Sequence, residues 1–305
     1  MLERLGIHGY GSIERALLAG VALGEPTLLW GPHGAAKTEL CRRVSAALGL
    51  RFWAYDASKS LFEDLLGFPN PAALAAGTVD YVRTPISIWD KQAILIDELN
   101  RANPQLQSKW LEVIHARQLM GCPLRELALV FAAMNPPTYL GTNPLDEALA
   151  GRFATILRVP VLSEMSDGDA RAVIDARPGA TPGDEDARAV RELVLRARER
   201  SLAAPAKVLR GISDYVFEVV RLLGAREVAV DGRRAGMIAR LCAARLAVEA
   251  ELAGGEVALG GPPLLEALLD EADQLVAIFG KSLVTLRGST REPPALSTLD
   301  PATDN

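Results

Sequence analysis

The chain has 305 residues, 49% of them hydrophobic and 23% charged, which is long enough for two domains and ordinary for a globular protein. Its formal net charge of -5 argues against nucleic acid as the main ligand, because sequence-independent binding to DNA or RNA comes from a basic surface. No apolar stretch is long enough to span a bilayer and no signal peptide is visible, so we expect a cytoplasmic protein without a membrane span.

Short apolar runs alternate with helical patterns in the first half of the chain. After the first of these runs, over 26–30, residues 38–48 have apolar residues at helical spacing. Runs of this kind are typical of strands buried on both faces, and their alternation with helices indicates a parallel sheet covered on both sides. We therefore predict an α/β fold with strands over 26–30, 93–96, 127–133 and 156–161.

The composition changes after Pro160 to a helical pattern rich in alanine, leucine and arginine. The amphipathic candidates are 186–200, 207–223 and 234–252, and turn residues predict a loop over 178–183. The three cysteines have no metal-ligand spacing, so we expect them to be small buried residues. We predict three regions: an α/β domain over 1–163, a helical domain over 164–292 and a disordered tail over 293–305.

A phosphate-binding loop is indicated directly after the first strand. It reads Gly31, Pro32, His33, Gly34, Ala35, Ala36, Lys37 and Thr38. In the pattern GxxxxGK[ST], backbone N–H groups surround the phosphates, the lysine reaches the β- and γ-phosphates and the hydroxyl ligates Mg²⁺. Ala36 replaces the second glycine and is acceptable if its φ is helical. We therefore expect all eight residues to line a site for the phosphates of ATP. The alternative is the start of a helix that contains Lys-Thr by chance.

Two adjacent carboxylates, Asp97 and Glu98, end the apolar run 93–96. Ligands of doubly wound sheets bind beyond the carboxyl ends of the strands, so we expect Asp97 close to Mg²⁺ and Glu98 to polarise the attacking water as general base. The alternative is a helix N-cap. The position of the pair about sixty residues after Lys37, at the end of a strand, favours the catalytic interpretation.

Two further polar residues follow in the pattern. Asn135 ends the next apolar run and could orient the attacking water, or it could be a turn residue before a proline. Arg152 precedes the last run and could stabilise transition-state charge from a neighbouring subunit, or it could complement a helix dipole.

Several segments together make the chain resemble the AAA+ ATPases, and among them the MoxR branch with its helix-2 insert. They are Gly-Pro-His-Gly-Ala-Ala-Lys-Thr (31–38), Glu-Asp-Leu-Leu-Gly (63–67), Asp-Glu-Leu-Asn-Arg-Ala (97–102), Gln-Ser-Lys-Trp-Leu-Glu-Val-Ile (107–114), Met-Asn-Pro-Pro (134–137), Gly-Thr-Asn-Pro-Leu-Asp-Glu-Ala (141–148) and Gly-Arg-Phe (151–153). Alanine before the lysine is common in MoxR-like loops.

The resemblance implies a P-loop AAA+ core with a C-terminal helical lid, and roles for single residues. Asn135 matches sensor 1 and Arg152 the arginine finger. Arg233 and Arg234 match the sensor 2 signature, with Arg234 the better match for the γ-phosphate arginine. The helix-2 insert is expected over 68–82 and the hairpin before sensor 1 over 119–127.

The resemblance also implies a Mg²⁺-dependent ATPase that forms a homo-oligomeric ring, expected to be a hexamer. Its hydrolysis would remodel or assemble a separate client or a von Willebrand factor A-domain protein. One alternative is a nucleotide-gated scaffold with slow hydrolysis. Another is an AAA+ subunit of a nucleic-acid-processing system, which the acidic balance disfavours. The choice between ATP and GTP, and between Arg233 and Arg234 as sensor 2, stays open.

Overall fold

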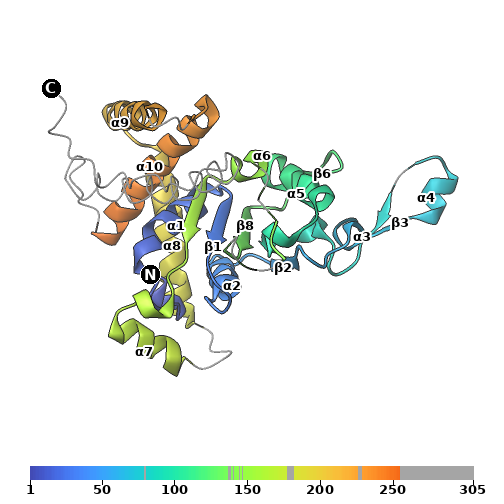
Figure 1. Cartoon of the computed structure of the whole chain (residues 1–305), viewed down its shortest axis with the longest axis horizontal. Coiled ribbons are helices and arrows are strands. Elements are labelled where there is room, and N and C mark those ends of the chain that lie inside the picture. The colour runs from blue at the N-terminus through green and yellow to red at the C-terminus, as the bar shows by residue number, and fades with distance from the viewer. Residues whose placement is uncertain are drawn as a thin grey trace.

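A computed structural model describes residues 1–254, apart from 79, 137–138, 140, 144, 146, 177–181 and 226–228. A five-stranded parallel sheet is the centre of the molecule, in the order β2-β5-β8-β1-β9 (Figure 1). Its strands are β1 (Thr27–Trp30), β2 (Phe52–Asp56), β5 (Ala93–Asp97), β8 (Leu129–Met134) and β9 (Thr155–Arg158). The expected parallel sheet is therefore confirmed.

Helices cover both faces of this sheet, because side chains of a strand point alternately to its two faces. One core contains Leu29, Leu95 and Phe131 together with apolar residues of α1, α2, α8 and α10. The other contains Leu28, Ile94 and Val130 with residues of α5. The longer helices are α1 (Gly11–Leu23), α2 (Lys37–Ala47), α5 (Pro104–Ala116), α7 (Asp167–Asp175), α8 (Asp184–Leu202), α9 (Ala206–Gly224) and α10 (Gly232–Leu252).

The helical second half does not stand apart from the sheet. α8 and α10 pack on each other and on α1, and their apolar residues belong to the same core as β1 and β8. α9 packs on α10 through a smaller cluster around Val216 and Leu246. The proposed boundary at 163 therefore stays a prediction, and the proposed loop and tail lie largely or wholly outside the described residues.

Two small hairpins extend from the sheet beside β2 and β5. The first pairs β3 (Phe68–Pro69) with β4 (Tyr81–Val82), and short α4 (Pro71–Ala75) lies between them. Figure 1 shows this hairpin as an arm that projects from the body. The second pairs β6 (Gln118–Leu119) with β7 (Cys122–Pro123). Both lie where the two inserted loops were expected.

Shorter elements complete the described chain. They are α3 (Phe62–Leu66), α6 (Glu147–Ala150), and the 3-10 helices η1 (Glu3–Leu5), η2 (Ile88–Asp90), η3 (Leu99–Arg101) and η4 (Leu162–Glu164). Cys41 and Cys242 are buried as expected, whereas Cys122 is exposed in the second hairpin. No helix among the described residues is long and apolar enough to cross a membrane.

Candidate functional site

The loop 31–38 joins the carboxyl end of β1 to the first turn of α2, as its sequence predicts. Gly31 lies against Val159, the residue after β9: a Cβ at Gly31 would come within 3.2 Å of the Val159 Cβ and 3.3 Å of its carbonyl oxygen. Gly34 has a φ of +76°, which favours glycine, and open space beside it. The two glycines thus serve different purposes, close packing on a strand and a left-handed turn.

Ala36 departs from expectation. An alanine in this loop was expected to be tolerated with a helical φ, but its φ is 49° and its ψ 23°, the left-handed region. That conformation costs a residue with a Cβ about 1–2 kcal/mol, whereas a glycine adopts it freely. Glu98 is also left-handed, with a φ of 54°. Two of the four non-glycine residues with positive φ in the described chain therefore lie in this site, where such strain is often found.

Lys37 has its ammonium group inside the loop. Its Nζ donates to the carbonyl oxygens of Gly31 and Pro32, both at 2.8 Å, and lies 3.4 Å from Oδ1 of Asn135. Burial lowers the pKa of Lys37, and the nearby carboxylates of Asp97 and Glu98 raise it in part. A buried cation with only weak acceptors around it is well suited to receive a phosphate oxygen.

Thr38 and Asp97 come together from different elements. The Thr38 hydroxyl donates to Oδ2 of Asp97 at 2.8 Å, so a hydroxyl and a carboxylate oxygen face each other across the loop. Mg²⁺ commonly takes one or two protein oxygens together with water and substrate phosphates. Thr38 and Asp97 supply two protein oxygens of this kind, so the pair fits a Mg²⁺ shared with a nucleotide.

Glu98 and Asn135 lie at the ends of neighbouring strands β5 and β8. The Asn135 amide nitrogen is 3.5 Å from Oε1 of Glu98, and Arg101 lies 3.4 Å from the other oxygen, Oε2. Asn135 is 2% exposed. Buried Asn100 donates at 2.9 Å to the Asn135 carbonyl oxygen and fixes the end of β8. The Asn135 amide thus lies between the Glu98 carboxylate and the Lys37 ammonium group.

A cavity of ≈ 620 Å³ opens beside the loop. Its walls come from the loop itself, from Glu39, Arg42 and Arg43 of α2, from the N-terminal segment before α1 and from the segment 160–176 after β9. The volume falls within the usual range of small-molecule sites. His33 lies in the wall, and its ring is 5.3 Å from that of Tyr139, so it has a packing role as well as its place in the loop.

Arg152 and Arg234 lie elsewhere. Arg152 follows α6 and precedes β9, whose Thr155 pairs with Thr27 at the amino end of β1. Arg234 is buried, and its Nη1 donates to the carbonyl oxygen of Phe153. In Figure 1, α6 and the beginning of α10 lie at the top of the sheet and α2 lies towards its bottom. Arg233 is exposed in the first turn of α10.

The structure therefore brings together Lys37, Thr38, Asp97, Glu98 and Asn135 at the carboxyl edge of the sheet. It places Arg152 and Arg234 at the amino edge, about 10 Å or more away along β1 at about 3.3 Å per residue. Within one chain the Arg234 guanidinium does not share a site with Lys37. No sequence pattern indicates this separation, because it depends on where α10 packs.

A profile of the AAA domain (dynein-related subfamily) matches residues 26–153, which include β1, the loop 31–38, β5 and β8. Residues 26–153 therefore form an AAA+ ATPase domain. The matched residues contain every member of the carboxyl-edge cluster as well as Arg152. The match to this domain indicates nucleotide binding.

The AAA+ domain has relatives of known sequence and known structure. The chain is 31% identical over 175 residues to the uncharacterized protein YojN of Bacillus subtilis, a match that covers 52% of this chain and 56% of YojN. A candidate ATPase from Cytophaga hutchinsonii has a similar fold, with a TM-score of 0.52 at 21% identity over 92% of this chain and 79% of that one. An MCM homolog from Methanopyrus kandleri has a TM-score of 0.54 at 16% identity, over 87% and 55%. These identities show a shared fold.

Two residues of the AAA+ site were missed by the sequence. Asn100 lies in the segment 97–102, but its sequence context indicates no role. In the structure its side chain, which follows β5, donates to the Asn135 carbonyl oxygen at the end of β8. Tyr10 precedes α1, and its hydroxyl donates to the carbonyl oxygen of Ala35 in the loop. No local pattern marks a tyrosine 25 residues away in sequence as a partner of the loop.

Proposed function

We propose that this chain is a Mg²⁺-dependent ATPase of the MoxR type, which assembles into a ring and uses hydrolysis to remodel or assemble a partner protein. The observation that carries the proposal is the division of the expected catalytic residues between two edges of one sheet. Each chain offers one incomplete half of a site, and the other half comes from a neighbour.

The carboxyl-edge cluster is the pocket half. Lys37 binds the β- and γ-phosphates, whose oxygens take the place of the two loop carbonyl oxygens that accept from its ammonium group in the structure. Thr38 and Asp97 would hold Mg²⁺, which would neutralise charge on the phosphates. Glu98 accepts a proton from the attacking water, and Asn135 orients that water from the adjacent strand.

The amino-edge arginines are the finger half. Arg152 contacts the γ-phosphate of a nucleotide bound by the adjacent subunit and neutralises charge in the transition state. Arg234 holds the Phe153 carbonyl, the residue next to Arg152. We propose that the start of α10, with Arg233 and Arg234, faces the neighbour's nucleotide rather than the chain's own. A head-to-tail interface of this kind closes into a ring when its rotation permits.

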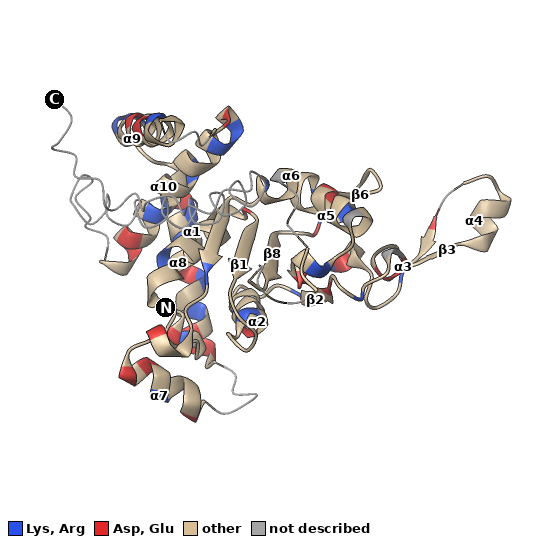
Figure 2. Ribbon diagram, viewed as in Figure 1, with Lys and Arg blue, Asp and Glu red and all other residues tan. Residues whose placement is uncertain are grey.

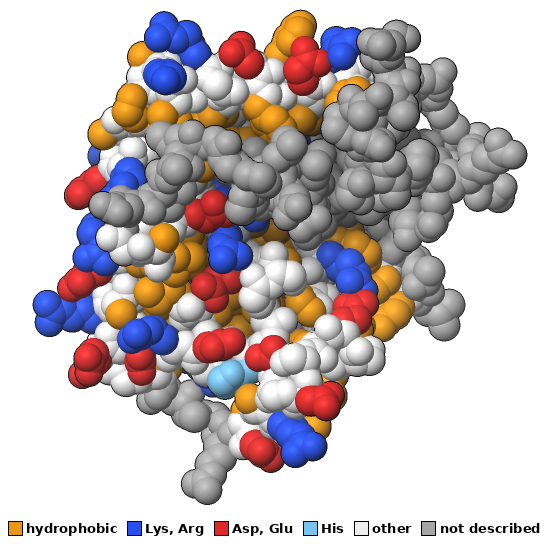
Figure 3. Space-filling view, turned by 90° about the vertical axis from the view of Figure 1, so that its left-hand side faces the viewer, with side chains coloured by type: hydrophobic (Ala, Val, Ile, Leu, Met, Phe, Trp, Pro, Cys, Tyr) orange, Lys and Arg blue, Asp and Glu red, His pale blue; other side chains and the backbone are white. Residues whose placement is uncertain are grey.

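The arm 67–82 supports a protein partner rather than nucleic acid. Phe68, Leu74 and Val82 are 61%, 52% and 52% exposed, and Asp80 is the one charged residue in this segment. Figure 2 shows the arm almost free of charged side chains. In Figure 3 the visible described surface has both signs of charge interspersed rather than a basic stripe. An exposed apolar element favours contact with another protein.

Assembly can be tested by sedimentation at fixed protein concentration, with Mg²⁺ and either no nucleotide, ATP or a slowly hydrolysed analogue. We expect larger species with nucleotide, because a γ-phosphate that contacts two subunits stabilises the assembly by mass action. A chain that stays monomeric at high concentration with ATP would leave Arg152 without a site and would overturn the proposal.

The partner can be sought by affinity capture with the Glu98→Gln variant in ATP, a variant expected to bind nucleotide without turnover. The matched control carries Phe68→Ser in addition, which changes the arm and leaves the nucleotide site intact. A protein that is captured with ATP and lost with Phe68→Ser would be a partner of the arm. Capture of equal amounts by both variants would contradict a role for the arm.

A further inference from the structure

The phosphate-binding loop contains a residue in a conformation that it does not favour. Ala36 lies in the left-handed region, with a φ of 49°, directly before Lys37. Rotation of the planar peptide between Ala35 and Ala36 by half a turn would change this φ to about -130°, a negative value that alanine prefers. An isolated loop of this sequence would therefore tend to rotate that peptide, and something must hold it.

The group in contact with this peptide is the Tyr10 hydroxyl. It donates a hydrogen bond to the Ala35 carbonyl oxygen, which is the oxygen of that same peptide. Tyr10 is 3% exposed and packs in the core beneath α1 and α2, so the position of its hydroxyl is fixed by packing. Burial raises its pKa, so the hydroxyl is protonated and can donate at neutral pH.

The orientation of this peptide matters for nucleotide binding. In a trans peptide the C=O and N–H groups point in opposite directions. With the Ala35 carbonyl held on the Tyr10 side, the Ala36 N–H points away from Tyr10, and Lys37 begins α2 with the correct approach to the loop. A rotated peptide would direct a carbonyl oxygen where an N–H is needed, and carbonyl oxygens repel phosphate.

We propose that Tyr10 is a positioning residue for nucleotide binding, whose hydroxyl holds the 35–36 peptide in the orientation that the phosphates require and so permits alanine in place of the usual glycine. The inference rests on the proposed nucleotide site. It adds a residue outside the segment 26–153 that matches the AAA domain. Tyr10 is needed in this chain because residue 36 is an alanine, which does not favour the left-handed conformation, rather than a glycine.

The test is a double-mutant cycle with four proteins: the natural sequence, Tyr10→Phe, Ala36→Gly, and both changes together. The dissociation constant for a fluorescent ATP analogue with Mg²⁺ is measured for each, alongside the thermal unfolding midpoint without nucleotide. We expect Tyr10→Phe to weaken binding about two- to tenfold with Ala36 present, the range for one hydrogen bond, and less than about twofold in the Ala36→Gly background. Glycine has no preference for the rotated peptide, so it should remove most of the dependence on Tyr10.

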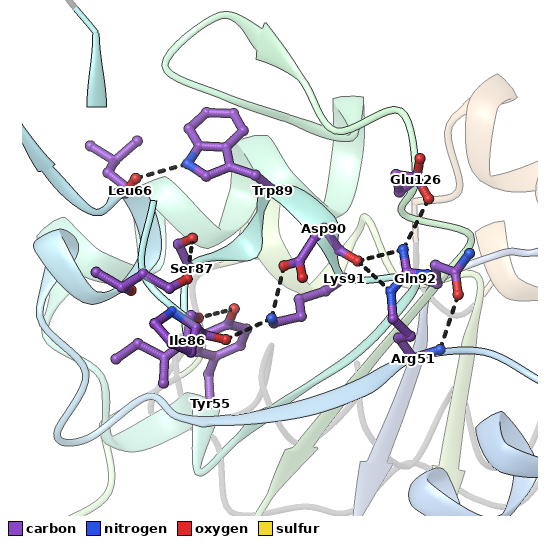
Figure 4. Close-up of polar contacts among 12 residues, drawn as sticks. Arg51, Tyr55, Leu66, Ile86, Ser87, Trp89, Asp90, Lys91, Gln92 and Glu126 are labelled. Carbon is purple, nitrogen blue, oxygen red and sulfur yellow. Dashed lines mark hydrogen bonds and ion pairs between the residues drawn. The ribbon is translucent and has the colours of Figure 1, made fainter. Parts of the chain in front are cut away.

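Tyr55→Phe is the matched control. Tyr55 is also 3% exposed, and its hydroxyl donates at 2.7 Å to a backbone carbonyl, that of Ile86 (Figure 4). That contact belongs to the network around Trp89 and Lys91 at the base of the arm, not to the phosphate-binding loop. Tyr55→Phe should lower the unfolding midpoint by an amount similar to Tyr10→Phe and leave the dissociation constant unchanged.

The possible outcomes distinguish the proposed nucleotide site from the proposed role of Tyr10. No binding by the natural sequence would overturn the proposed function and the inference together. Binding by the natural sequence, with an equal effect of Tyr10→Phe whether or not Ala36→Gly is also present, would overturn the inference alone. A Tyr10→Phe protein that binds normally, or that does not fold, would also overturn it, because the hydroxyl is assigned to the loop rather than to the stability of the core.

Discussion

The two edges of the central sheet differ in how their polar residues are held. At the carboxyl edge, Lys37, Thr38 and Asp97 contact one another or nearby backbone over short distances, and Ala36 and Glu98 are in strained conformations. At the amino edge, Arg234 donates to the carbonyl oxygen of Phe153, the residue next to Arg152. The carboxyl edge is a preformed pocket. The amino edge carries the arginines, which lie outside that pocket. The difference indicates that neither edge is a complete site in one chain.

Loss of the pocket should have the largest effect. Lys37→Ala removes the cation that reaches the phosphates, and we expect no measurable ATP binding by isothermal titration. Lys91→Ala is a matched control, because Lys91 is also buried and its Nζ donates at 2.8 Å to the backbone carbonyl oxygen of Pro85. Lys91→Ala should bind ATP normally. Equal loss in both variants would mean that Lys37 acts through stability alone.

Loss of the finger should abolish turnover without loss of the pocket. Arg152→Ala should bind ATP with near-normal affinity and hydrolyse it about 10³- to 10⁵-fold more slowly, the range for arginine fingers. Phosphate release measures the rate. Arg240→Ala is the control on the same edge: Arg240 forms a surface ion pair with Glu25 at 2.8 Å and should be dispensable. A fully active Arg152→Ala enzyme would assign Arg152 to the structure of α6.

Glu98→Gln should keep binding and lose turnover by about 10²- to 10⁴-fold, the usual contribution of a general base. The amide is the same size as the carboxylate and can keep the contact with Asn135, but it cannot accept the proton. Hydrolysis at the natural rate by Glu98→Gln would show that the base is another residue.

Of the variants considered, Arg234→Gln and Arg233→Gln should change turnover the least. Arg234 is buried and bonded to the Phe153 carbonyl, whereas Arg233 is exposed. If Arg234 positions the segment of Arg152, Arg234→Gln should lower turnover less than Arg152→Ala does and leave ATP affinity unchanged. A loss of affinity in Arg234→Gln as a monomer would instead place Arg234 in the chain's own pocket.

Sequence predicted which residues meet at the carboxyl edge because these residues are marked by local patterns. A loop after an apolar strand and carboxylates at the end of another are readable without tertiary structure, and parallel strands bring such ends to one edge. The unpredicted strand β2 illustrates the limit. Phe52–Asp56 has an apolar run of four residues, 52–55, but it is a short edge strand whose side chains are exposed or half-exposed at most positions. A short apolar run of this kind does not by itself distinguish a strand from a segment of helix.

The remaining features depend on contacts distant in sequence. The left-handed φ of Ala36 depends on where the Tyr10 hydroxyl lies, and the place of Arg234 depends on α10 packing beside α1. Neither is visible in the residues around Ala36 or Arg234 themselves. The same limit applies to α8 and α10, whose helical pattern is clear in sequence but whose shared core with β1 and β8 is not.

The most direct test of a site divided between chains is a mixture of Glu98→Gln and Arg152→Ala subunits. Each variant alone should be nearly inactive, the first with a finger and no base, the second with a base and no finger. We predict that mixed rings recover hydrolysis at interfaces where an Arg152→Ala pocket meets the arginine of a Glu98→Gln neighbour. If native mass spectrometry shows mixed rings and phosphate release stays at the level of the separate variants, the two edges do not complete one another and the account is wrong.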